Sequence, residues 1–301
     1  MIKAITVTNY LGEKIKLELA RPDLSGFVVK SITGLGPGKA NVNTTDVITN
    51  DGGIFNSARL PIRNIGLSLE FLWIGSVEDM RQLSNKYFPI KKKVTLLIET
   101  SNRTSEIEGI VESNEPTIFS KSEGTEISII CANPYFQSKT INTTVFRGVD
   151  PMFEFPFCND SLDEPLLEMG IIKMMQEQVI TYQGDAETGV TITIHAIGEA
   201  ENISIYNVKS REVMHIDTNK LKALTGSSII EGDEIIICTI KGKKSITLIR
   251  GGISMNILGC LDKNANWFQL VKGDNVFAYV SEYGNSNLQF KIENRIIYEG
   301  V

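Results

Sequence analysis

The chain has 301 residues, of which 42% are hydrophobic and 22% charged, so it can bury a sizeable core and is neither disordered nor fibrous. Its formal charge of −6 argues against a sequence-independent nucleic-acid binder and against broad attraction to anionic membranes. This length predicts two domains.

The first part of the chain alternates apolar and polar residues, which predicts strands at Ile5–Asn9, Lys14–Leu19 and Gly26–Ile32. Because the N-terminal residues alternate and carry charge, we interpret them as a strand pair and not as a signal peptide. No apolar run approaches the roughly 18 residues that span a bilayer. We therefore expect neither membrane insertion nor specific binding of nucleic acid.

The stretch Gly34–Trp73 begins with a Gly/Pro cluster and ends in a strand whose apolar positions alternate from Ile65 onward. Between them lies a segment of roughly 20 residues, which we expect to be a loop without regular structure. A disordered linker usually lacks apolar residues, but this segment has several: Ile48, Ile54, Phe55 and Leu60. The pattern therefore predicts a loop that is ordered by packing, for instance on another copy of the chain.

Ser76 is a good N-cap, and Met80, Leu83 and Tyr87 follow at helical spacing, which predicts one helix ending near Pro89. Lys91-Lys92-Lys93 is predicted to be an exposed turn, or in an assembly to pair with acidic residues of a neighbouring chain. Further strands are predicted at Val94–Glu99, Ser105–Ser113 and Glu126–Ala132. We expect a domain boundary near residue 138, which gives domains 1–138 and 139–301.

The second domain is predicted to be β throughout, because many short strands follow one another at regular spacing. The strongest hairpin signal joins Glu234–Ile240 to Ser245–Arg250 through Lys241-Gly242-Lys243-Lys244. The other predicted strands are Thr144–Arg147, Met152–Phe157, Leu166–Met175, Val190–Ala196, Ile203–Asn207, Val213–Asp217, Trp267–Leu270, Asn275–Val280 and Leu288–Tyr298. This part of the sequence favours an antiparallel sandwich.

Few residues suggest chemistry. The segment Gly34–Lys39 lacks the first glycine and the hydroxyl residue of a phosphate-binding loop, and no helix is expected after it, so we interpret it as a tight turn. His195 and His215 are predicted to be strand residues. Acidic clusters occur at Asp160, Asp163 and Glu164 and at Glu231, Asp233 and Glu234, where solvated turns are expected. No metal site, cofactor or catalytic set is predicted.

The four cysteines are Cys131, Cys158, Cys238 and Cys260. They have no CxxC spacing and lie in apolar, strand-like segments, so buried free thiols are predicted over disulfides or a metal site. Synthesis in a reducing cytoplasm is consistent with this interpretation.

Motifs in both halves of the chain resemble those of one known family. In the first half they are Gly34-Leu35-Gly36-Pro37, Asn43-Thr44-Thr45, Asp51-Gly52-Gly53-Ile54-Phe55-Asn56-Ser57-Ala58-Arg59 and Arg63-Asn64-Ile65, with Asn133-Pro134-Tyr135-Phe136 at the boundary. In the second half they are Gly242-Lys243-Lys244-Ser245-Ile246-Thr247-Leu248-Ile249-Arg250, Trp267-Phe268-Gln269-Leu270, Gly273-Asp274-Asn275-Val276-Phe277 and Tyr298-Glu299-Gly300-Val301. On these residues the chain resembles the siphophage distal tail protein family, and the resemblance covers nearly its whole length.

The resemblance implies an N-terminal split β-barrel with one α-helix and a C-terminal galectin-like antiparallel β-sandwich. It also implies a homohexameric ring, not an enzyme, at the tip of a non-contractile phage tail in the virion. Such a ring joins the tail tube protein to the tail-associated hub or tail fibre protein. Its outer domain can hold receptor-binding proteins. The genome passes through the lumen without specific binding.

Two sets of residues are candidates for contact. We predict the subunit interface at Asn50, Asp51, Gly52, Phe55, Arg59 and Arg63, where Phe55 and Leu60 supply apolar anchors and the arginines bond a neighbour's carboxylates. The alternative function is a glycan-binding, lectin-like adhesion module that contacts the host cell wall. Its aromatic candidates are Trp267, Tyr279 and Tyr283, although core packing is the more ordinary role for Trp267.

Overall fold

A computed structural model describes residues 1–46, 51–72, 76–117, 122–151, 170–174 and 177–301 of the chain. The chain divides into two compact units, one formed by Met1–Thr140 with Ile297–Val301 and the other by Ile141–Ile296. The expected boundary at residue 138 thus falls two residues before the division. The last five residues, expected in the second domain, belong to the first unit because they pair there.

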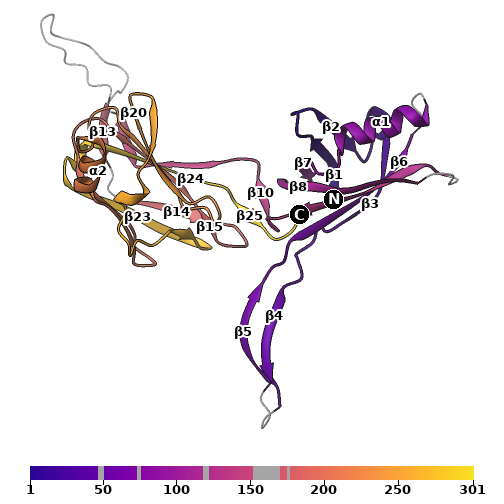
Figure 1. Ribbon diagram of the computed structural model, residues 1–301, viewed down its shortest axis with the longest axis horizontal. Helices are drawn as coiled ribbons and strands as arrows, with labels where there is room; N and C mark the ends of the chain where they lie inside the picture. Colours follow the sequence, from indigo (N-terminus) through magenta and orange to yellow (C-terminus); the bar gives the residue numbers. More distant parts are fainter. Residues whose placement is uncertain (47–50, 73–75, 118–121, 152–169, 175–176) are drawn as a thin grey trace, which may run out of the picture. The chain divides into compact units, whose positions relative to one another are not determined.

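Unit 1 is built on one curled antiparallel sheet of nine strands that does not close (Figure 1). Its main path runs in the order β2 (Lys14–Glu18), β1 (Ile2–Thr8), β7 (Lys93–Thr100), β8 (Thr104–Thr117), β9 (Gly124–Cys131), β6 (Arg63–Phe71) and β3 (Phe27–Thr33). Strand β10 (Phe136–Ser138) pairs with both β8 and β25 (Ile297–Tyr298). The sequence predicted each of the seven main strands, with shifted ends.

Alternate side chains of β6 form part of the core of unit 1. Its buried residues Ile65, Leu67, Leu69 and Phe71 join one apolar cluster with residues of β1, β7, β8 and β9, while the residues between them are partly or fully exposed. Trp73, predicted at the end of this strand, lies outside the described residues.

The helix predicted from Ser76 is confirmed as α1 (Val77–Tyr87), which packs on the sheet through Met80. The Asp79 backbone N–H donates to Ser76 Oγ at 3.2 Å, and the Ser76 backbone N–H donates to the Asp79 carboxylate at 3.1 Å. This capping box satisfies donors that the first helical turn leaves unpaired.

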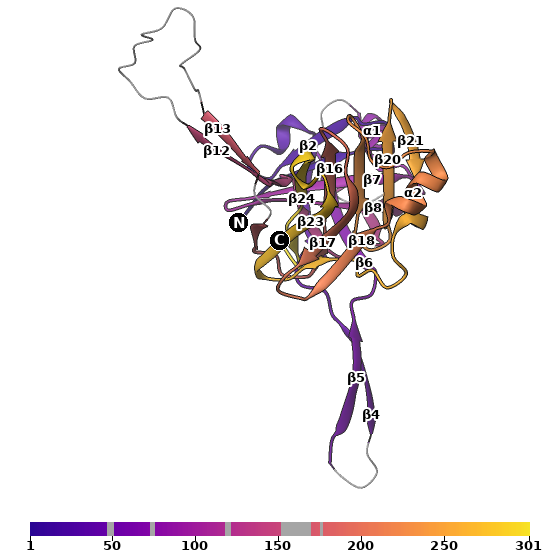
Figure 2. The same ribbon diagram turned by 90° about the vertical axis from the view of Figure 1, so that its left-hand side faces the viewer.

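The segment expected to be an unstructured loop is a β-hairpin, so that prediction was wrong. Strands β4 (Asn41–Asp46) and β5 (Gly53–Arg59) pair antiparallel with each other and with no other described strand. The hairpin extends away from the sheet of unit 1 in both views (Figures 1 and 2). Its residues show no alternation of burial, which is why period-2 analysis did not find it.

Unit 2 contains two larger antiparallel sheets. The six-stranded sheet runs in the order β11 (Asn142–Val145), β24 (Leu288–Asn294), β16 (Thr191–Ala196), β19 (Glu234–Cys238), β20 (Ser245–Arg250) and β21 (Ile253–Asn256). The four-stranded sheet runs β14 (Glu177–Tyr182), β23 (Gly273–Tyr283), β17 (Glu201–Asn207) and β18 (Glu212–Ile216). Two small pairs join β12 (Arg147–Pro151) to β13 (Gly170–Met174) and β15 (Thr188–Gly189) to β22 (Gln269–Leu270).

The core of unit 2 lies between its two larger sheets, which makes the unit a β-sandwich as predicted. One cluster combines buried side chains of β16, β19, β20 and β24 with those of β17, β18 and β23. The Tyr279 and Phe290 rings stack across it with centroids 3.8 Å apart. The hairpin predicted at Glu234–Arg250 is confirmed as β19 and β20. The predicted strand Met152–Phe157 lies outside the described residues.

A helix that the sequence analysis missed, α2 (Thr218–Thr225), interrupts the strands of unit 2. Its N-cap, Asp217, accepts from the backbone N–H groups of Asn219 and Lys220. It ends at Gly226, whose φ is +84°. These two residues are ordinary start and stop signals, but the strand pattern around them masked the short helix.

Within the described part of the chain, no helix is both long enough and apolar enough to cross a membrane. Among the same residues, no group of His, Cys, Asp or Glu side chains has a geometry that could hold a metal ion. Cys131, Cys238 and Cys260 are free thiols, and Cys158 lies outside the described residues.

Candidate assembly interface

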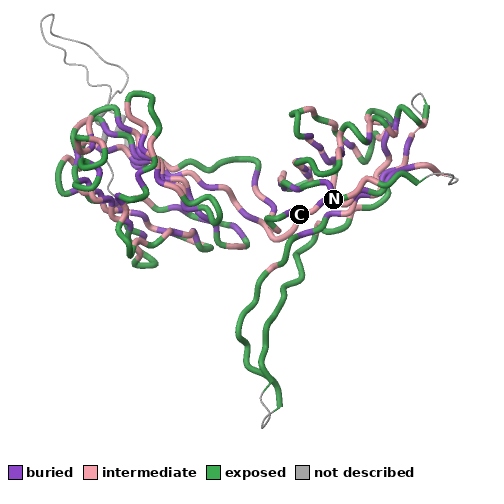
Figure 3. The backbone as a smooth tube through the Cα atoms, viewed as in Figure 1, coloured by how far each residue is buried: buried purple, intermediate pink, exposed green. Residues whose placement is uncertain are grey.

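The β4–β5 hairpin is exposed over its whole length, since every residue of both strands is exposed (Figure 3). Its exposed apolar side chains include Val42, Ile54 and Phe55, with 57%, 60% and 63% of their surfaces accessible. Gly52 adopts φ +96° in the connecting turn, a conformation that glycine tolerates best. Isolated two-stranded hairpins are marginally stable in water, so this one is suited to binding a partner.

The two faces of the hairpin differ in chemistry. Cross-strand partners share a face, and the pairs Val42–Ala58 and Thr44–Phe55 lie on one of them, which we call the apolar face. The opposite, polar face carries Asn41, Asn43, Thr45, Ile54, Ser57 and Arg59. The pair Asp46–Gly53 continues the apolar face at the turn end of the hairpin. This face therefore gathers Val42, Ala58 and Phe55, with Thr44 and Asp46 as its polar members.

A β-bulge at Asn56 produces this arrangement. Asn43 pairs with Ser57 and Thr44 with Phe55, so Asn56 has no partner opposite it. Its side-chain amide instead donates to Thr45 Oγ1 at 2.7 Å. In a regular strand Phe55 would share a face with Ser57 and Arg59, but the extra residue brings it to the face of Val42 and Ala58.

The charges of the hairpin are separated along its length. Asp46 and Asp51 flank the turn, and residues 41–58 contain no lysine or arginine. Lys39 and Arg59 are exposed at the opposite end, where the hairpin joins the sheet. The described charges near the turn are therefore acidic, and the root carries the exposed cations Lys39 and Arg59 together with Glu299.

The structure separates the predicted interface residues into two groups. Asp51, Gly52, Phe55 and Arg59 are all exposed on the hairpin, and Asn50 lies outside the described residues. Arg63 is different, because only 6% of its surface is accessible. We therefore correct the role expected for Arg63 while retaining the other residues as candidates.

Arg63 bonds its own chain. Its guanidinium donates to four backbone carbonyls: Pro134 at 2.6 Å, Gly34 at 2.5 Å, Gly36 at 2.6 Å and Glu299 at 2.7 Å. It also lies over the Phe136 ring, 4.8 Å from its centroid. Burial lowers the pKa of Arg63. Its donors are committed to the root of the hairpin, so it does not offer them to a neighbour's carboxylates.

The last residues of the chain complete the root. Gln137 and Phe136 pair with Ile297 and Tyr298, and the Val301 backbone N–H donates to the Leu35 carbonyl at 3.0 Å. Together with the Arg63–Glu299 bond, these contacts join the end of the chain to the segment in front of β4.

Gly34 is required at the root for two reasons. Its φ is +80°, and a Cβ atom built on it would lie 2.1 Å from the Asn64 carbonyl oxygen. The tight turn predicted for Gly34–Lys39 is thus a backbone bend whose carbonyls accept from Arg63, and a strand follows it rather than a helix.

A surface pocket of about 370 Å³ opens at the root. Its walls combine apolar side chains, the exposed Lys39 and the backbone of the glycine segment; the lining residues are Gly34, Gly36, Pro37, Gly38, Lys39, Leu60, Pro61, Ile62, Arg63, Asn64 and Pro134. Ile62, at 62% accessible, is exposed beside it. The pocket is open to solvent, and its lining combines apolar side chains with one exposed lysine.

The aromatic residues proposed for glycan contact do not form a shared platform. Tyr279 is only 1% accessible and stacks in the core of unit 2, so it cannot present its ring to a sugar. Burial also raises the pKa of its hydroxyl. Trp267 packs partly against the core, with Lys244 Nζ 5.2 Å from its ring centroid, and Tyr283 is exposed. The prediction for Tyr279 is therefore corrected.

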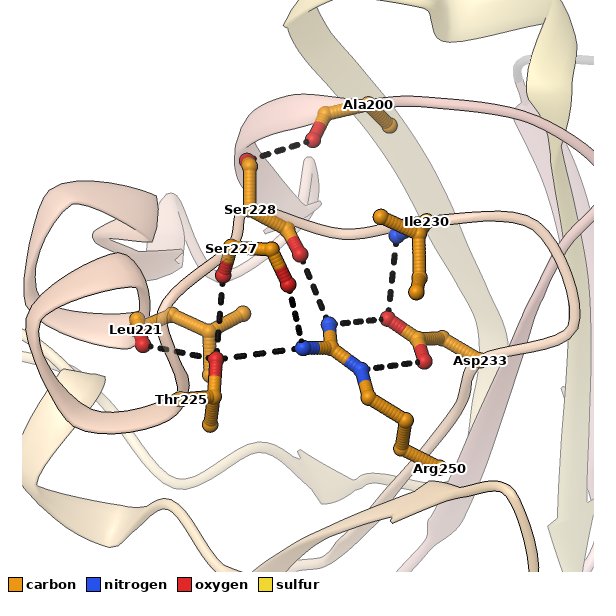
Figure 4. Close-up of polar contacts among 8 residues, drawn as sticks. All are labelled: Ala200, Leu221, Thr225, Ser227, Ser228, Ile230, Asp233 and Arg250. Carbon is orange, nitrogen blue, oxygen red and sulfur yellow. Dashed lines mark hydrogen bonds and ion pairs between the residues drawn. The ribbon is translucent and has the colours of Figure 1, made fainter.

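The acidic cluster around Asp233 is structural where it is described (Figure 4). Asp233 is 1% accessible, accepts two bonds from Arg250 and one from the Ile230 N–H, and so was wrongly expected to lie in a solvated turn. Arg250 also bonds Thr225, Ser227 and the Ser228 carbonyl, which uses all its donors. The hydrogen bonds that Arg250 donates to the Asp233 carboxylate raise the pKa of Arg250. Asp160, Asp163 and Glu164 lie outside the described residues.

Comparison with known proteins assigns this architecture. Residues 183–295 match the family model described as the siphovirus-type tail component, C-terminal domain. The crystal structure of the SPP1 Dit (gp 19.1) protein, described as a paradigm of the hub adsorption apparatus in phages that infect Gram-positive bacteria, resembles the chain with a TM-score of 0.65 and 12% identity, covering 98% of this chain and 100% of that one. The activated phage P2 baseplate with Ca gives 0.51 and 12%, covering 98% of each chain. No curated protein matches the sequence.

The fold of the whole chain resembles that of the SPP1 Dit protein, and the part matched by the family model is a siphovirus-type tail component, C-terminal domain. Residues 183–295 belong to that family, and the resemblance of the chain to the siphophage distal tail proteins is confirmed.

Proposed function

We propose that this protein forms a homohexameric ring at the distal end of a non-contractile phage tail. The observation that carries the proposal is the β4–β5 hairpin, an exposed extension with an apolar face in a chain whose fold matches a hub protein. Each copy offers one surface and accepts a different one, and such heterologous contacts close into a ring when the rotation between copies allows it.

The proposed partners follow from the position of the ring. One side contacts the tail tube protein, the other contacts the tail-associated hub or fibre protein, and unit 2 provides attachment for receptor-binding proteins. The solved relatives are described as parts of an adsorption apparatus and a baseplate, which supports this placement at the virion tail tip. The role is assembly and conduction rather than catalysis.

The negative net charge of the chain is suited to a ring whose channel conducts DNA. Six copies at −6 each give a ring of roughly −36, and acidic walls repel phosphates so that the genome passes without sticking. Mapping the charge of the channel in an assembled ring tests this part of the proposal, and a basic lining would refute it.

The test of ring formation uses the double variant Phe55→Ala with Arg59→Ala. Because both residues are exposed, we expect a folded subunit with unchanged circular dichroism and thermal unfolding, but no hexamer by light scattering or native mass spectrometry. Leu24→Ala with Arg21→Ala is the matched control, since Leu24 is 64% accessible and Arg21 is likewise exposed.

Each outcome has a clear meaning. Hexamers of the double variant that are as stable as those of the wild type would refute the hairpin as the ring contact. An unfolded double variant would show that the hairpin serves its own unit. Loss of hexamers in the control variant as well would show that the effect is not specific to the hairpin.

A further inference from the structure

We infer that the apolar face of the β4–β5 hairpin of one copy seats Phe55 in the root pocket of the next copy, and that Phe55 lies on this face because Asn56 is bulged and not paired. The inference rests on the proposed ring and names the surface that receives the hairpin. The occupant of the pocket is thus a second copy of this chain.

Apolar complementarity favours the root pocket as the receiving surface. Phe55 and Val42 are more than half exposed on the apolar face. The pocket offers Leu60, Pro61 and Pro37 as apolar walls, and an exposed aromatic side chain gains most from a preformed concave site of this kind. Phe55 lies near the turn, so it can enter a pocket while Val42 and Ala58 extend the contact along the hairpin.

The distribution of charge along the hairpin also favours the root as the receiving surface. Asp46 and Asp51 lie at the turn, whereas Lys39 and Arg59 lie at the root. Strand β5 has 7 residues, so the two ends are roughly 20 Å apart at about 3.3 Å per residue and cannot pair within one hairpin. They can pair between copies, where the acidic residues at the turn of one hairpin meet the exposed cations at the root of the next. Such a contact is head-to-tail, as ring closure requires.

The surface around Ile90 and Ile110 is the alternative receiving surface. Ile90 and Ile110 are each 53% accessible and lie beside Lys91-Lys92-Lys93. However, Lys93 forms an ion pair of 2.7 Å with Glu108, and Lys92 lies over the Tyr10 ring at 5.3 Å. These partners within the unit reduce the positive charge available to a neighbouring chain, whereas the root combines a pocket with the exposed cations Lys39 and Arg59. The root is therefore the better match.

The bulge explains why Phe55 is on the correct face. If Asn56 were paired in the ladder instead of bulged, the unbroken alternation would place Phe55 beside Ser57 and Arg59 on the polar face. The face of Phe55 is thus set by whether residue 56 is bulged or paired, and not by the Asn56 side chain. Two variants without a bulge, one with Phe55 on each face of the hairpin, test whether the face of Phe55 decides the contact.

Deleting Asn56 removes the bulge and leaves every cross-strand pair as it is, so Phe55 stays on the apolar face. Inserting an alanine between Asn43 and Thr44 also removes the bulge, but it places the alanine opposite Asn56 and turns Phe55 to the polar face. Both changes lie on a hairpin with no buried residue, so we expect both subunits to fold, which thermal unfolding checks.

The test is disulfide cross-linking with Phe55→Cys and Ile62→Cys in one chain, with Cys158 and Cys238 replaced by serine. Oxidation of assembled rings is expected to give a ladder of covalent oligomers up to hexamers. Phe55→Cys with Ile90→Cys is the matched control and is expected to give at least tenfold less. The deletion of Asn56 should preserve the ladder, and the alanine insertion should reduce it at least tenfold.

Failures of the two proposals are distinguishable. Rings that cross-link through position 90 but not through position 62 would overturn the inference and leave the proposed function standing. Equal cross-linking by the deletion and the insertion would overturn the role of the bulge. A wild-type chain that stays monomeric at every concentration would contradict the proposed ring, and the inference with it.

Discussion

The hairpin and its root are adjacent in the sequence, yet different contacts hold them in place. The hairpin has only local pairs between β4 and β5 and buries none of its residues. The root is fixed by Arg63, whose bonds reach carbonyls 27 to 236 positions away along the chain. A segment can therefore be ordered by its own fold at one end and left for a partner at the other.

The difference has an energetic consequence for the isolated subunit. Removing a buried donor leaves its acceptors without partners, which costs more than the bond itself contributed. Removing an exposed side chain typically changes stability by less than about 0.5 kcal/mol. Substitutions at the root should therefore affect folding, and substitutions on the hairpin should affect association.

The largest effect is expected for Arg63→Met, which leaves four carbonyls of the root unpaired. We expect the free energy of unfolding of unit 1 to fall on the order of 3–5 kcal/mol, measured by urea denaturation. Arg63→Lys should recover little, because an ammonium lacks the planar fork of donors. Arg59→Met is the control and should leave the urea midpoint in place; equal midpoints for the two methionine variants would contradict the assignment.

Cys131, which pairs with Arg63 across β9 and β6, provides the next test. Burial raises the pKa of its thiol from 9.0 to about 11. Because the folded pKa is the higher one, the stability is fully present below pH 9 and is lost as pH rises from 9 to 11, by roughly 2–3 kcal/mol in all. Urea unfolding at pH 8 and pH 10 measures this loss.

Cys131→Ala controls for other groups that titrate at high pH. The wild type should lose more stability than this variant between the two pH values. Parallel losses in the two proteins would show that Cys131 is not the group responsible.

Gly34→Ala should have an intermediate effect at the root. The added Cβ meets the Asn64 carbonyl and the residue keeps a positive φ, so we expect a loss of about 2 kcal/mol in unfolding free energy. Gly36→Ala is the matched control, because a Cβ there has no heavy atom within 4 Å. A loss at Gly36 as large as at Gly34 would argue against local strain.

These differences also explain which features could be predicted from the sequence. The strands β6, β19 and β20 and the helix α1 were found because alternation and capping are local signals. The turn at Gly52 was found for the same reason. The strands of the hairpin were missed because a surface exposed on both faces has no alternation, and a bulge disrupts what remains.

The role of Arg63 was not predictable from its neighbours in sequence. Its acceptors are backbone carbonyls, one of them on Glu299, and carbonyls occur at every position whatever the residue type. Tyr279 was misjudged for a related reason. Its burial depends on stacking with Phe290 of β24, which only the pairing of the sandwich brings close.

The smallest effect on stability, and the sharpest contrast in association, is expected within the hairpin itself. Ile54 and Phe55 are adjacent and almost equally exposed, but they lie on opposite faces. Ile54→Ser and Phe55→Ser should each change the free energy of unfolding by less than about 0.5 kcal/mol, because neither side chain packs on unit 1. Only Phe55→Ser should weaken the hexamer, as sedimentation over a dilution series would show. Equal weakening by both variants would mean that the hairpin is enclosed by its partner on both faces, and the apolar face would then lose its priority over the polar one.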